Sequence, residues 1–133
     1  MTDAVQRAQD DGRWEKIMGS SRAVAAGDRV SVAGMLPYSG DELMGEGDAR
    51  EQTAVAFGNA LAQLREFGLG PEAVIRTRTY LTHARDVDAA CFAHREIFGT
   101  VRPAATVVIV TGFVDSRVLV EVEVEAYRGT TGV

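Results

Sequence analysis

The sequence predicts an α+β fold in which two helices cover one face of a mixed β-sheet. Strand-like and helix-like segments follow one another in the order ββαβαββ, so each predicted helix lies between strands. The last predicted strand, from Val118 to Tyr127, alternates valine with glutamate and so has one apolar and one acidic face. A chain of 133 residues has the length of one ordinary domain. We therefore expect a flexible N-terminal arm over residues 1–12 and a single domain over residues 13–133.

The first two predicted strands form a hairpin. Two runs, residues 21–26 and 29–35, flank the pair Gly27-Asp28, which is typical of a tight turn between antiparallel strands. The glycine-rich, acidic residues 36–47 that follow predict a surface loop.

The first predicted helix runs from Asp48 to Leu69. Asp48 can cap it, and Glu51 stands at capping-box spacing. Helical periodicity predicts one buried stripe, made of Ala54, Phe57, Leu61 and Leu64. The second predicted helix follows Asp86 and ends at Gly99, and its apolar stripe includes Cys91 and His94. Both side chains are therefore expected to pack in the core.

Two further strands are predicted around the second helix. The first covers residues 74–81, and its period-two pattern places Ile75, Thr77, Thr79 and Leu81 on one face. The second covers residues 105–113 and precedes the valine–glutamate strand.

The acidic face of the last strand needs partners. If Glu121, Glu123 and Glu125 are buried between subunits, each unpaired carboxylate costs several kcal/mol, so cations should lie opposite them. Arg76 and Arg78 are the candidates. The alternative is a row of glutamates exposed to solvent.

Composition excludes several classes of function. The chain has 14 basic and 19 acidic residues, a net charge of −5, which disfavours nucleic acid as a partner. No apolar run reaches the roughly 20 residues of a membrane span, so we expect no membrane insertion. One cysteine excludes an internal disulfide, which fits a cytoplasmic location. Metal-ligand spacings are absent, so no metal site is predicted.

Two motifs lie in the second half: Arg102-Pro103-Ala104 before the fourth strand, and Val-Glu-Val-Glu in the fifth. With them, the chain from about Ser20 to Arg128 resembles the Rid family, the reactive intermediate deaminases also called YjgF or RidA. The resemblance implies a chorismate-mutase-like homotrimer with sheets inward, helices outward, and small-molecule clefts between adjacent subunits. It also implies hydrolysis of enamines and imines without a metal or organic cofactor.

The resemblance also implies positions for the site residues. Glu121 matches the family glutamate, to which we assign the catalytic role, and Gly34 matches the glycine whose backbone faces the ligand. Ala33 stands where the family usually has serine, and Val107 where it often has cysteine. Ala105 replaces the arginine that clamps the substrate carboxylate in RidA. Because alanine has no polar side-chain atom, a different mode of substrate recognition is expected.

Two arginines are further candidates for substrate binding. Arg102 is the arginine nearest in sequence to the missing clamp, and Arg22 begins the first strand, where the family places side chains over the cleft mouth. Both arginines can instead have purely structural roles, and Glu121 can instead belong to an ion pair between subunits.

The resulting hypothesis is that the protein is an enamine or imine deaminase, or a tautomerase-like enzyme. The alternative is a non-catalytic trimer that binds a small metabolite, and the ribonuclease label sometimes attached to this family fits the net charge of −5 poorly.

Overall fold

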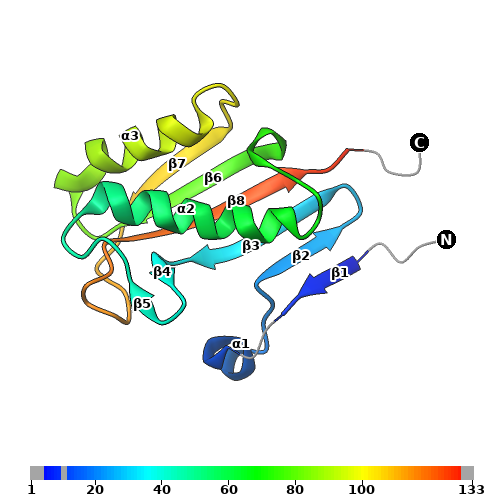
Figure 1. Ribbon diagram of the computed structural model, residues 1–133, viewed down its shortest axis with the longest axis horizontal. Coiled ribbons are helices and arrows are strands. Elements are labelled where there is room, and N and C mark those ends of the chain that lie inside the picture. Colours follow the sequence, from blue (N-terminus) through cyan, green and yellow to red (C-terminus); the bar gives the residue numbers. More distant parts are fainter. Residues whose placement is uncertain (1–4, 10–11, 130–133) are drawn as a thin grey trace.

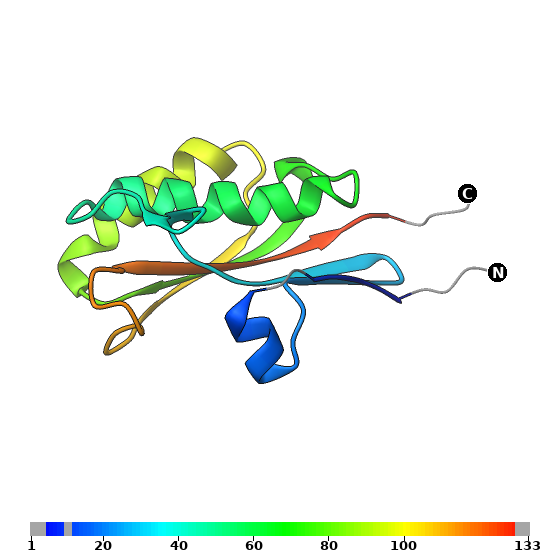
Figure 2. The same cartoon turned by 60° about the horizontal axis from the view of Figure 1, so that its bottom comes forward.

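A computed structural model describes residues 5–9 and 12–129, and over these residues the chain forms a six-stranded sheet with two long helices on one face (Figures 1 and 2). The strands of this sheet are β1 (Val5–Ala8), β2 (Ala23–Ala26), β3 (Arg29–Met35), β6 (Val74–Leu81), β7 (Ala104–Ile109) and β8 (Val120–Tyr127). The covering helices are α2 (Ala49–Arg65) and α3 (Val87–Phe98). The short helix α1 (Arg13–Met18) lies on the opposite face, which we call the open face (Figure 2).

The sheet order is β1-β2-β3-β8-β6-β7. Every neighbouring pair is antiparallel except β6 and β7, which are parallel and connected through α3. A small separate hairpin, β4 (Tyr38–Ser39) with β5 (Glu42–Leu43), lies in the loop before α2 (Figure 1). The predicted α+β fold is confirmed, with all seven predicted elements in their predicted order.

The β8 strand divides the molecule into a core side and an open side. Its inward valines, Val120, Val122 and Val124, are at most 1% exposed and pack beneath α2. The glutamates between them lie on the open face and are partly exposed. The predicted two-faced character of this strand is confirmed.

The expectation of a loose arm over residues 1–12 is wrong at Val5–Ala8, which form the edge strand β1. This segment pairs antiparallel with β2, from Val5 opposite Ala26 to Ala8 opposite Ala23. Its side chains are mostly exposed, so the strand is held by backbone hydrogen bonds rather than by an apolar face. Residues 1–4 and 10–11 of the expected arm lie outside the described residues.

The buried face of α2 also differs from the predicted stripe. Ala54 is exposed, whereas Phe57 and Leu64 are buried as expected. Gln52 is fully buried because its amide donates to the carbonyls of Gly45 and Arg117 and accepts from the Leu119 amide. These three hydrogen bonds make a polar residue suitable for an inward position that hydrophobic periodicity does not identify.

Two other side chains lie on the opposite side from the one predicted. Ile75 is 38% exposed because the register of β6 against β8 shifts between Val74 and Arg76, which turns Val74 inward instead. Cys91 is exposed, because α3 buries the face that carries Ala90 and Ala93. The expected core packing of Cys91 is therefore wrong.

We predict that Val122→Lys destabilises the fold by several kcal/mol, because it places an unpaired ammonium group in the apolar layer under α2. The control is Ile75→Lys in β6, where the exposed position should limit the change to about 0.5 kcal/mol. Chemical denaturation of both variants checks this prediction, and equal losses of stability in the two would contradict it.

Candidate functional site

The open face carries a row of polar groups that crosses β2, β3, β8 and β6. The Ala33 amide donates to the Arg22 carbonyl at 2.9 Å, which continues the β2–β3 pairing to the residue before the start of β2. On the other side of β3 lies β8, and its glutamates stand in register with residues of β6, with Glu121 opposite Tyr80. The structure therefore brings together four predicted site residues, namely Arg22, Ala33, Gly34 and Glu121.

Gly34 and Glu121 are in direct contact. A Cβ atom added at Gly34 would lie only 2.5 Å from Glu121 Oε2 and 2.7 Å from its Cδ. The pairing of β3 with β8 is irregular between Val32 and Met35, and this bulge contains Gly34. A Cβ atom at position 34 would therefore displace the Glu121 carboxyl group, whereas the bare glycine backbone lets the carboxyl group pack directly against it.

The environment of Glu121 favours its protonated form. Burial, and secondarily the negative charge of Glu123, raises the pKa of the Glu121 carboxyl above its usual value. Within the described chain no side-chain hydrogen bond or ion pair reaches Glu121. A partly buried carboxyl group with a raised pKa is suited to exchanging a proton with a bound molecule.

The other two glutamates of β8 have side-chain partners. The Tyr80 hydroxyl donates to Glu123 Oε1 at 2.7 Å, and this hydrogen bond raises the pKa of Tyr80. Arg78 Nη1 lies 3.4 Å from Glu125 Oε2, as anticipated for an arginine opposite the acidic row. Arg76 instead donates to the Thr106 hydroxyl at 2.8 Å. Tyr80 therefore lies beside the candidate site. Its position in the period-two pattern of β6, on the face away from the core, is the sequence feature that indicates this.

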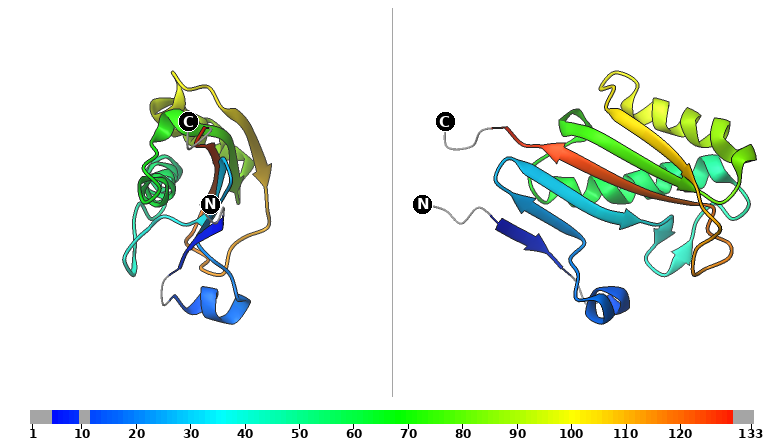
Figure 3. Two further views of the ribbon diagram at one scale, coloured as in Figure 1. Left: turned by 90° about the vertical axis from the view of Figure 1, so that its right-hand side faces the viewer. Right: turned by 180° about the vertical axis from the view of Figure 1, so that it is seen from behind.

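Arg22 connects this row to α1. Its Nε lies 3.2 Å from Glu15 Oε2, and this ion pair joins the short helix to the start of β2. α1 lies on the open face of the sheet (Figures 2 and 3), and the burial alternation of β8 places Glu121 on this face as well. Its apolar side chains Trp14, Ile17 and Met18 are all largely exposed.

Ala105 and Val107 lie elsewhere. They pair with Thr77 and Thr79, whose side chains are buried on the helix side of the sheet. Together with α3 they line a small pocket of about 80 Å³, formed by Thr79, Ala90, Cys91, His94, Ala105, Thr106 and Val107. Within a single chain, Ala105 and Val107 are therefore separated from Glu121, which lies on the open face.

Arg102 also lies away from Glu121, in a pocket of about 280 Å³ at the C-terminal end of α3. His94 borders both pockets, and its Nε2 lies 2.8 Å from the Thr77 hydroxyl oxygen. Its ring stacks edge-on against Phe57, and burial lowers its pKa, so it is neutral at pH 7. These contacts agree with a packing role for His94.

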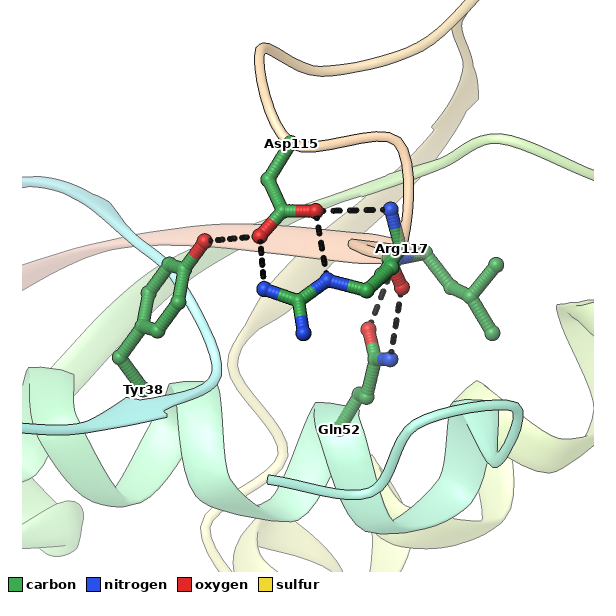
Figure 4. Close-up of polar contacts among 5 residues, drawn as sticks. Tyr38, Gln52, Asp115 and Arg117 are labelled. Carbon is green, nitrogen blue, oxygen red and sulfur yellow. Dashed lines mark hydrogen bonds and ion pairs between the residues drawn. The ribbon is translucent and has the colours of Figure 1, made fainter. Parts of the chain in front are cut away.

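A second polar cluster, which sequence patterns did not reveal, fixes the loop before β8 (Figure 4). The Tyr38 hydroxyl and Arg117 Nη2 donate to Asp115 Oδ2 at 2.6 and 2.7 Å. Hydrogen bonds from Arg117 and from Tyr38 hold the pKa of Asp115 well below its usual range. The buried Gln52 connects this loop to α2 by accepting the Leu119 amide and donating to the Arg117 carbonyl. Tyr38 and Gln52 are far from this loop in sequence, so no local pattern signals their contacts with it.

The residues that the structure describes contain no group of three or more histidine, cysteine, aspartate or glutamate side chains that could hold a metal ion. Nor is any helix among them long and apolar enough to cross a membrane.

Comparisons with known proteins agree with this architecture. Residues 13–128 match the family model described as Endoribonuclease L-PSP. An uncharacterized protein of Streptomyces coelicolor is 60% identical over 128 residues, which cover 96% of each chain. A RutC family protein of Pyrococcus abyssi is 33% identical over 111 residues, covering 81% of this chain and 85% of the relative.

Solved structures show the same fold. A member of the YjgF/YER057c/UK114 family from Mycobacterium tuberculosis superposes with a TM-score of 0.82 at 30% identity, covering 92% of this chain and 98% of the other. A Rid-family protein from Yersinia pestis gives a TM-score of 0.75 at 25% identity, covering 81% and 86%. The chain therefore belongs to the YjgF/RidA family, whose model is the Endoribonuclease L-PSP model, as the sequence motifs predicted.

We predict that Glu121→Gln becomes more stable relative to the wild type as the pH rises from about 4 to 7. The raised pKa means that the folded state holds the proton more tightly than the unfolded chain, so the wild type loses stability above the ordinary carboxyl pKa of about 4.3. The melting temperatures of both proteins across this range check the prediction. Glu125→Gln controls for the loss of a negative charge on the same face. A stability difference between Glu121→Gln and the wild type that shrinks with rising pH would contradict the prediction.

Proposed function

We propose that this protein is a cofactor-independent hydrolase of small imines or enamines, acting at clefts between the subunits of a homotrimer. The observation that carries the proposal is the Glu121 carboxyl, packed against the bare backbone of Gly34 with a raised pKa. Membership of the YjgF/RidA family supports the reaction class.

The chemistry requires one group that alternates between base and acid. The C=N bond reacts in its protonated form: Glu121 accepts a proton from water while the water oxygen adds to carbon, which gives a neutral carbinolamine. Glu121 then returns this proton to nitrogen, the C–N bond breaks, and the carbinolamine hydroxyl proton passes to Glu121 as ammonia leaves a carbonyl product. Glu121 finally gives this proton to ammonia. The balance is one protonated imine and one water in, one carbonyl compound and one ammonium ion out, with no change of oxidation state. An enamine enters this sequence after protonation at carbon.

The exposed edge strand supports assembly between copies. β7 pairs on one side only, with β6, and Val107, Val108 and Ile109 are 37–48% exposed. An apolar strand edge of this kind is unfavourable in an isolated subunit. In the proposed trimer, a neighbouring copy brings its β7 with Ala105 and Val107 to the Glu121 row, which completes a cleft that one chain does not form.

Ala105 favours a second candidate function, a non-catalytic trimer that binds a metabolite. A methyl group cannot make the bidentate hydrogen bonds by which an arginine holds a carboxylate. A ribonuclease role is disfavoured, because a net charge of −5 repels a phosphate backbone.

We predict that Glu121→Gln lowers ammonia release from imines by about 10² to 10⁴, the usual contribution of a general acid or base. The imines are generated in place by an amino-acid oxidase acting on a panel of amino acids, and ammonia is measured by a coupled assay. Glu125→Gln, on the same strand and face but paired with Arg78, is the matched control and should retain activity. Absence of wild-type activity on the whole panel favours the binding function instead.

We predict a solution mass of about 43 kDa, three times 14.3 kDa, by light scattering at micromolar concentration. Val108→Lys on the β7 edge should reduce this mass, because a charge there opposes burial of the edge. A monomeric wild type would contradict the inter-subunit cleft.

A further inference from the structure

The larger pocket lies at the C-terminal end of α3, on the helix side of the sheet. It has a volume of about 280 Å³ and is lined by His94, Arg95, Phe98, Gly99, Arg102 and Pro103. Two of these six residues are arginines and none is acidic. The pocket is therefore cationic in a chain whose net charge is −5.

Neither arginine is engaged elsewhere in the described part of the chain. Arg50 and Arg117, for comparison, form ion pairs with carboxylates at 3.2 and 2.7 Å. No side-chain hydrogen bond or ion pair of Arg95 or Arg102 is found among the described residues. Since acidic residues outnumber basic ones 19 to 14, a shortage of acidic partners does not explain this.

Capping of α3 does not account for the two side chains. The Arg95 carbonyl already accepts the Gly99 amide at 2.8 Å. The Phe98 carbonyl accepts the amides of Val101 and Arg102 at 3.0 and 2.8 Å. Because backbone amides satisfy these carbonyls, the guanidinium groups are not required for that purpose.

The backbone of Arg102 is a third observation. Its φ of 58° makes it the one non-glycine residue with a positive φ in the described chain, where seven glycines adopt such angles. This left-handed conformation is unfavourable for a residue with a Cβ atom, and glycine would fit it better. An arginine at this position therefore points to a role of its side chain beyond the turn.

We propose that this pocket binds a small carboxylate-bearing molecule, held between Arg95 and Arg102. A guanidinium group matches a planar carboxylate with two parallel hydrogen bonds, and the Pro103 ring provides apolar contact for the rest of the ligand. The site is separate from the Glu121 row, which lies on the other face of the sheet. It does not depend on the function proposed above.

Calorimetric titration of the full-length protein with pyruvate tests the proposal. We expect binding by the wild type, no binding of the neutral analogue pyruvamide, and at least a tenfold higher Kd in Arg95→Gln and in Arg102→Gln. Arg65→Gln on α2, an exposed arginine outside the pocket, is the matched control and should bind like the wild type. Equal pyruvate binding by wild type and both pocket variants would overturn the proposal, as would its absence in the wild type or binding of inorganic phosphate alone.

Arg102→Gly separates binding from folding. Glycine relieves the left-handed conformation, so this variant should melt at a higher temperature than the wild type while pyruvate binding is lost. Retained binding in a stabilised Arg102→Gly variant would overturn the role of Arg102. Because the pocket faces away from Glu121, this result is informative whether or not the protein releases ammonia.

Discussion

The alternation of valine and glutamate along β8 is the constraint on which the rest of the structure depends. β8 lies between β3 and β6, so each of its residues is fixed from both sides by backbone pairing. A slip of one residue would place the glutamates under α2 and the valines on the open face. The high cost of burying three carboxylates therefore sets the register of β8, and with it the position of Glu121 beside Gly34.

Sequence periodicity predicted those parts of the fold that are governed by apolar burial. It identified the faces of β8 and the bounds of β6, because an alternating pattern has only one arrangement that buries its apolar face. Sequence periodicity failed where an interaction other than apolar burial determines the position of a residue. β1 is held by backbone pairing, Gln52 is buried by its three hydrogen bonds, and Ile75 is turned outward by a bulge. None of these three causes is visible in a hydrophobic pattern.

The site was predictable to a similar degree. The family resemblance assigned both Gly34 and Glu121 to the site. Their direct contact depends on a bulge in β3 and on the absence of a Cβ atom at Gly34, which only the three-dimensional geometry shows. The same resemblance grouped Ala105 with them in a cleft between subunits; within one chain, Ala105 lies on the helix side of the edge strand, apart from Glu121. Sequence proximity likewise made Arg102 a replacement for the missing clamp, whereas the chain places it at the end of α3.

Charge is distributed unevenly between the two sides of the sheet. The open face carries the β8 glutamates, and the negative charge of Glu123 contributes to the raised pKa of Glu121. The pocket on the helix side carries two arginines and no acid, and the neutral His94 beside them adds no further positive charge. An anion is therefore favoured at the arginine pocket, where no carboxylate among the described residues competes for the guanidinium groups, over the open face, where Arg78 is already paired with Glu125. This difference supports the proposal that the Glu121 site takes neutral or cationic imines.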